Sequence, residues 1–96
     1  MTEAPILFNR LCVIGIGLIG SSILWASRER GLATTLVAAD VSKAVRARVR
    51  ELGMADEVTG DVAQAVRGAE CVILCVPSGS FGAVAKAIGT DRKSVV

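Results

Sequence analysis

Residues 11–20 read LCVIGIGLIG, an apolar run that passes directly into three glycines with the spacing G-x-G-x-x-G. A continuous apolar run is typical of a parallel strand buried on both faces, so this stretch predicts a strand that turns straight into a helix. Gly15 would allow the tight turn, Gly17 the close approach of a pyrophosphate, and Gly20 the close packing of helix on strand. Unpaired N–H groups at the start of that helix would then hold the phosphates.

A carboxylate further along the chain supports this interpretation. The glycine spacing alone is weak, because about 0.1 chance matches are expected in a chain with this glycine content. Asp40, however, lies 20 residues past Gly20 and closes a second apolar run. A carboxylate there accepts hydrogen bonds from the adenosine ribose and repels a 2′-phosphate. The sequence therefore predicts a site for NAD rather than NADP, a preference that Arg46 could partly reverse.

The whole chain alternates apolar runs with amphipathic segments, which indicates parallel strands joined by helical crossovers. The expected strands cover residues 9–16, 35–40, 57–59, 71–76 and 93–96, and the expected helices 18–30, 43–52, 62–67 and 81–89. This pattern predicts an α/β fold, a doubly wound parallel sheet of Rossmann type with the strand order 3-2-1-4-5. We expect an N-terminal tail over residues 1–8 and a dinucleotide-binding domain over 9–96, incomplete because the chain ends within the fifth strand.

In a sheet of this order, a ligand crevice opens where the strand order reverses, beyond the carboxyl ends of the first and fourth strands. The loops over residues 15–20 and 76–80 should face each other across it. Ser78 and Ser80 in the second loop could bond a ribose or nicotinamide, or could cap the following helix.

Apolar spacing also predicts which helix faces are buried. In the helix over 18–30 we expect Ile19, Ile23 and Ala26 to form one apolar stripe, with Leu24 beside it. Trp25 is expected to belong to the core or a domain interface rather than to stack on a ligand.

In the helix that follows Ser42, the buried stripe is expected at positions i, i+4 and i+7. These positions are Val45, Val49 and Leu52. The basic residues of this helix are interpreted as a solvated face: Lys43, Arg46, Arg48 and Arg50.

Composition excludes several classes of protein. The 96 residues suffice for one small domain, and no apolar run is long enough to cross a bilayer. A net charge of +2 is too small for a nucleic-acid footprint. Residues 1–8 lack the basic start and long apolar middle of a signal peptide, so we expect a cytoplasmic protein.

The chain contains three cysteines and no histidine. The cysteine spacing matches no zinc site, and we interpret Cys12, Cys71 and Cys75 as small buried thiols rather than metal ligands. Neither a Ser-His-Asp nor a Cys-His system can be assembled without histidine, so no catalytic residue is predicted within this chain.

Three segments together resemble a known family. Residues 15–22 read GIGLIGSS, residues 52–57 LGMADE and residues 69–77 AECVILCVP. In this combination and order they resemble the N-terminal half of prephenate/arogenate (cyclohexadienyl) dehydrogenases. The resemblance implies an oxidative decarboxylation in tyrosine biosynthesis, in which a hydride passes from the cyclohexadienyl ring to NAD and the ring carboxylate leaves as CO₂.

The resemblance also implies roles for individual residues. Asp40 would bind the adenosine ribose, whereas Val41 departs from the family, which often places there an arginine that packs on adenine; Lys43 or Arg46 could cover it instead. The pyrophosphate would be held by Gly15, Gly17, Leu18, Ile19 and Gly20, and the nicotinamide side lined by Val76, Pro77 and Ser78.

The family's catalytic histidine and its helical domain would lie beyond residue 96. This chain would then bind the cofactor without catalysing the reaction, and the full-length parent would be a homodimer acting on prephenate or arogenate, a small-molecule substrate. Two alternatives stay open: a free-standing NAD-sensing regulatory module, and the cofactor domain of another hydroxy-acid dehydrogenase.

Overall fold

A computed structural model describes residues 7–76, 79, 81–88 and 94–95. The elements follow one another as β1 (Phe8–Ile14), α1 (Leu18–Arg30), β2 (Ala33–Ala39), α2 (Lys43–Leu52), β3 (Glu57–Thr59), α3 (Val62–Ala65), β4 (Cys71–Leu74), α4 (Phe81–Ile88) and β5 (Ser94–Val95). All strand pairs are parallel, and the sheet order is β3-β2-β1-β4-β5. The predicted doubly wound α/β fold and its strand order are confirmed.

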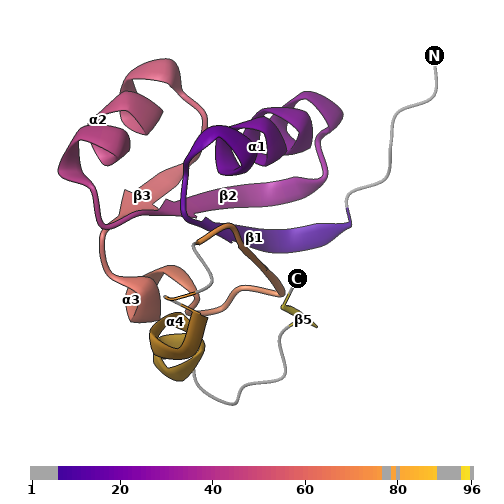
Figure 1. The fold of residues 1–96 in the computed structure, drawn as a ribbon. Coiled ribbons are helices and arrows are strands. Elements are labelled where there is room, and N and C mark those ends of the chain that lie inside the picture. The colour runs from indigo at the N-terminus through magenta and orange to yellow at the C-terminus, as the bar shows by residue number, and fades with distance from the viewer. Residues whose placement is uncertain (1–6, 77–78, 80, 89–93, 96) are drawn as a thin grey trace.

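The sheet lies between two layers of helices. Figure 1 shows α1 and α2 over one face of the sheet and α3 and α4 over the other. The last four residues of β1 and of β2 are buried between the two layers and are all apolar, which explains the apolar runs in the sequence. None of the helices in the described part of the chain is both long and apolar enough to cross a membrane.

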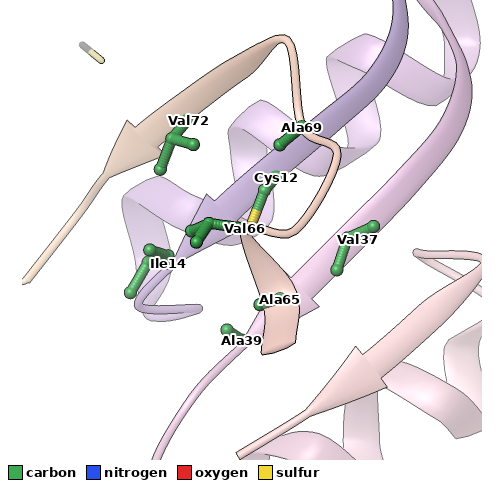
Figure 2. Packing of buried hydrophobic residues seen from close by; sticks show 8 residues of the cluster. All are labelled: Cys12, Ile14, Val37, Ala39, Ala65, Val66, Ala69 and Val72. Carbon is green, nitrogen blue, oxygen red and sulfur yellow. The ribbon is translucent and has the colours of Figure 1, made fainter. Parts of the chain in front are cut away.

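Successive side chains of β1 and of β2 enter different core layers. One buried cluster, shown in Figure 2, joins three strands to the segment around α3; it consists of Cys12, Ile14, Val37, Ala39, Ala65, Val66, Ala69 and Val72. The intervening strand residues pack with α1 and α2 in a second cluster of Val13, Ile16, Leu24, Ala38, Val49 and Met54. β1 therefore supplies both layers and is the centre of the fold.

The predicted buried face of α1 is right in part: Ile23 is half-buried against the second cluster and Leu24 beside it is buried, but Ile19 and Ala26 are exposed. The buried residues of this helix are Gly20, Leu24 and Ser27, whereas the Ile19 side chain is 68% exposed. Gly20 has to face the strand because it packs on the carbonyl of Gly15, and a helix repeats that face at positions i+4 and i+7. The glycine, rather than the isoleucines, determines the orientation of the helix.

Two further large apolar side chains are less buried than expected. Trp25 is 39% exposed, so it does not lie in the core of this domain, and its alternative place in a domain interface stays a prediction. Leu52, the last member of the predicted α2 stripe, is 46% exposed. Val49 of the same stripe is fully packed. The helix itself begins as predicted, because the Ser42 hydroxyl accepts a hydrogen bond from Val45 N–H (3.3 Å).

Several predicted strands end earlier than expected. β1 ends at Ile14 rather than 16, β2 at Ala39 rather than 40, and β4 at Leu74 rather than 76. In each case the chain leaves the ladder at the carboxyl end to form a loop, so Gly15 and Asp40 lie just beyond the sheet.

The amino side of the sheet carries two ion pairs. The Arg10 guanidinium on β1 donates to both Glu57 carboxylate oxygens on β3 (2.8 and 2.6 Å), and thus reaches across β2. Asp56 accepts from Leu36 N–H (2.8 Å) and from Arg28 of α1 (3.3 Å). We call these four charged residues, Arg10, Arg28, Asp56 and Glu57, the amino-side cluster. It gives the acidic end of the 52–57 segment a role in holding the sheet together.

Candidate functional site

A cavity of about 430 Å³ opens at the carboxyl ends of the central strands. This volume lies within the usual range for small-molecule sites. The cavity is lined by Ile14, Gly15, Gly17, Asp40, Val41, Val62, Cys75, Val76 and Val84. Among these residues only Asp40 carries a charge. The glycine turn after β1 and the start of the segment after β4 therefore share one cavity, as the strand order predicted.

The three glycines of the turn differ in what requires them. Gly15 has a positive φ of +89°, and a Cβ built on it lies 2.6 Å from the carbonyl oxygen of Cys75. A Cβ on Gly20 would collide with the Gly15 carbonyl. These two glycines are needed for the protein's own packing.

Gly17 is different, because a Cβ built on it meets no atom of the described residues within 4 Å and its φ is −85°. Neither the backbone conformation nor a protein neighbour requires a glycine at this position. The open space in front of Gly17 borders the cavity. It provides the close backbone approach that a bulky anion needs.

The amino end of α1 adjoins this open space. Gly17 is the N-cap and makes no side-chain hydrogen bond to the helix. The N–H groups of Leu18, Ile19 and Gly20 have no intrahelical acceptor, since the first turn of any helix leaves its donors unpaired. Leu18 and Ile19 have exposed side chains that do not line the cavity, so they can contribute backbone N–H groups and the helix dipole.

Asp40 is half-buried and already hydrogen-bonded to the main chain. Its Oδ2 accepts from Ile16 N–H (2.8 Å), and its Oδ1 accepts from Ser42 N–H (2.8 Å). The carboxylate thus ties the end of β2 to the glycine turn. A carboxylate has about four acceptor sites, so each oxygen can still accept from a sugar hydroxyl. The bond to Ser42 is of the Asx-turn type, which an Asp two residues before an N-cap could have indicated.

Arg46 is not part of a solvated face, and that prediction is wrong for this residue. Its Nη1 donates to the carbonyls of Asp40 (2.8 Å) and Val41 (3.0 Å), and the side chain is half-buried. The other basic residues of α2 are exposed, as predicted: Lys43, Arg48 and Arg50. Sequence spacing gave no indication of the difference, because the carbonyls that hold Arg46 belong to the preceding loop.

The remaining predicted residues lie on or beyond the edge of the described segment. Val76 lines the cavity. Pro77, Ser78 and Ser80 lie outside the described residues. Val41, where the resemblance would place an arginine, is an exposed apolar residue at the cavity.

The cysteines are mostly buried, as predicted. Cys12 and Cys71 are buried, whereas Cys75 is half-buried and lines the cavity. Burial raises the pKa of the Cys12 thiol to about 12 and also raises the pKa of Cys71 and of Cys75. All three thiols are therefore protonated at neutral pH and poor nucleophiles. Within the described ranges no three His, Cys, Asp or Glu side chains gather as a metal site would require.

Comparisons with known proteins agree with the resemblance found in the sequence. The family described as "NADP oxidoreductase coenzyme F420-dependent" matches residues 10–96. A cyclohexadienyl dehydrogenase from Zymomonas mobilis is 42% identical over 89 residues, which make up 93% of this chain and 30% of that protein. The chain thus spans less than a third of the curated relative.

Solved structures show the same fold. A prephenate dehydrogenase from A. aeolicus, crystallised with hydroxyphenyl propionate and NAD⁺, superimposes with a TM-score of 0.82 at 22% identity, covering 91% of this chain and 32% of that one. An arogenate dehydrogenase from Synechocystis gives a TM-score of 0.78 at 25% identity, covering 90% and 31%.

Proposed function

The chain belongs to the NADP oxidoreductase, coenzyme F420-dependent family, and on this premise we propose that residues 9–96 are the NAD-binding domain of a prephenate/arogenate dehydrogenase. The observation that carries the proposal is the open space at Gly17, beside a helix start whose first N–H groups have no intrahelical acceptor. The related cyclohexadienyl dehydrogenase supports the choice of enzyme type.

The residues present fit the two charged or polar parts of such a dinucleotide. The pyrophosphate rests against the backbone at Gly17 and the N–H groups of Leu18, Ile19 and Gly20, where it meets the positive end of the α1 dipole. The ribose hydroxyls donate to the free acceptor sites of Asp40. Bound NAD supplies the hydride acceptor of the reaction.

The nicotinamide side of the site is assigned to the segment after β4. Val76 contributes an apolar wall to the cavity. Pro77 and Ser78 continue this wall in our proposal, as the sequence predicted. Apart from Asp40, the described residues that line the cavity are uncharged, and most of them are apolar.

NAD is preferred to NADP in this proposal, although the family description mentions NADP. The Asp40 carboxylate would meet the 2′-phosphate of NADP as a like charge, and its position is fixed by two backbone N–H groups. The A. aeolicus prephenate dehydrogenase, whose fold this chain shares, was crystallised with NAD⁺.

The chemistry itself is assigned to parts of a longer protein. The chain has no histidine, and Asp40, the charged residue of the cavity lining, already binds backbone N–H groups. We therefore propose no catalytic residue within residues 1–96. The chain covers 30% of the curated relative. We therefore propose the substrate, prephenate or arogenate, and the homodimer for a protein of the relative's full length.

Gly17→Ala tests the proposal. The added methyl group meets no protein atom but occupies the approach path of the pyrophosphate, so NAD affinity should fall by at least about tenfold in a calorimetric titration. The thermal unfolding temperature should fall only slightly, by the small cost of an alanine at the N-cap of α1. Gly82→Ala in α4 is the matched control, because a Cβ there also meets nothing within 4 Å and Gly82 does not line the cavity. If Gly17→Ala binds NAD as tightly as the parent, the site lies elsewhere.

A further inference from the structure

We propose that Arg46 is a positioning residue for cofactor choice. Its guanidinium holds the β2–α2 loop so that the Asp40 carboxylate favours NAD over NADP. Residue 60 is a glycine because a side chain there would occupy the space of this guanidinium. This inference rests on the proposed function, because it concerns how Asp40 meets the adenosine ribose. It assigns a role to two residues that lie outside the glycine turn and the cavity lining.

The first support is the way in which the loop is held. Arg46 Nη1 donates to the carbonyls of Asp40 and Val41 at 2.8 and 3.0 Å. The Val41 carbonyl and the Ser42 N–H belong to one planar peptide unit. Since that N–H donates to Asp40 Oδ1 at 2.8 Å, Arg46 grips one end of the peptide plane whose other end orients the carboxylate.

The second support is Gly60, which follows β3. A Cβ built on Gly60 lies 2.7 Å from Arg46 Nη1 and 3.1 Å from its Cζ, so the guanidinium fills the space that a side chain would take. Gly60 is not among the glycines with positive φ, and its backbone conformation does not demand a glycine. The space requirement therefore comes from Arg46.

A different role for Arg46 would be to bind the 2′-phosphate of NADP directly. Its Nη1 is committed to two carbonyls, which speaks against that role. The two roles predict opposite changes in selectivity, defined here as the dissociation constant of NADP divided by that of NAD. Loss of a positioning residue weakens NAD binding more and lowers selectivity, whereas loss of a phosphate ligand weakens NADP binding more and raises it.

The test measures the affinities of NAD and NADP by calorimetry, and thermal unfolding, for three variants. Arg46→Met removes the donors. Gly60→Ala displaces the guanidinium while leaving the net charge unchanged. Arg50→Met is the matched control, because Arg50 also lies on α2 and donates to a backbone carbonyl, that of Val58 (3.1 Å), but does not touch the loop.

We expect selectivity to fall about fivefold in Arg46→Met and in Gly60→Ala, because both variants lose the hydrogen-bonded restraint on the loop. Selectivity should stay unchanged in Arg50→Met. A rise in selectivity in Arg46→Met would overturn the inference in favour of direct phosphate binding. Equal changes for both cofactors, or none, would reduce Arg46 to a purely structural role. Should the unaltered protein bind no NAD, the proposed function fails as well, and that result is visible before any variant is compared.

Discussion

The polar groups at the amino ends of the strands and those at the carboxyl ends are paired in different ways. On the amino side, the carboxylates of Asp56 and Glu57 meet the guanidinium groups of Arg28 and Arg10. On the carboxyl side, the N–H groups at the start of α1 have no intrahelical acceptor. On the amino side the charged side chains pair with one another, although the buried Arg10 Nε has no partner among the described residues, and on the carboxyl side the first helix donors lack an intrahelical acceptor. Mutations on the amino side should therefore change stability alone, and those on the carboxyl side should separate stability from binding.

The sharpest test of this comparison lies within the glycine turn. Gly15→Ala should destabilise the protein by about 3 kcal/mol, because the residue has a positive φ and its Cβ would overlap the Cys75 carbonyl. Gly17→Ala should cost less, about 0.5–1 kcal/mol, because Gly17 is the N-cap of α1, where alanine is less favourable than glycine. Chemical denaturation of both variants measures the difference. Equal destabilisation would show that the turn is one structural unit with no position reserved for a ligand.

Asp56→Ala should have the next largest effect, and only on stability. It removes the acceptor of a half-buried backbone N–H of Leu36 and the partner of Arg28, at a cost of about 2 kcal/mol. The dissociation constant of NAD should be the same as for the parent once both proteins are folded. A weaker NAD complex would mean that the amino side communicates with the cavity, and the comparison would break down.

Asp40→Asn should act mainly on cofactor choice. The neutral amide no longer repels a 2′-phosphate, so the preference for NAD over NADP should fall by about tenfold, or about 1.4 kcal/mol. The free energy of unfolding should fall by less than this 1.4 kcal/mol, because the amide oxygen can keep one of the two hydrogen bonds from backbone N–H groups. Titrations with both nucleotides measure the ratio, and an unchanged ratio would remove Asp40 from the ribose site.

The smallest effect is expected at the Arg10–Glu57 pair, whose carboxylate side chain is 53% exposed. The hydrogen bond from Arg10 lowers the pKa of Glu57, so the pair stabilises the fold above the ordinary glutamate pKa and loses its effect as the pH falls through the lowered folded value. Glu57→Gln should therefore cost about 0.5 kcal/mol at pH 7 and less at pH 3. Unfolding temperatures at both pH values test this, and a constant difference would contradict it.

The sheet and the location of the site were predictable because both depend on short-range patterns. Apolar runs fix the strands, and a glycine turn after the first of them fixes the crevice at their carboxyl ends. The face of α1 was not predictable from apolar spacing. Gly20 set it through contact with the Gly15 carbonyl, a restraint stronger than the burial of one isoleucine.

The role of Arg46 was equally hidden. Four basic residues on one helix look alike in the sequence, and only the fold shows which of them reaches the carbonyls of the preceding loop. The same applies to the second task of Asp40, which was predicted as a ribose ligand and also fastens the loop to the glycine turn. Contacts between backbone groups and distant side chains leave no periodic signal.

The unequal demands on the three glycines bear on how this turn can drift during evolution. A descendant that no longer used a nucleotide would be released from the need for Gly17 but would still require Gly15 and Gly20 to fold. Replacement of Gly17 alone would then indicate a domain that has lost nucleotide binding but keeps its fold. The residue at position 17 would thus distinguish a homologous domain that binds a nucleotide from one that no longer does.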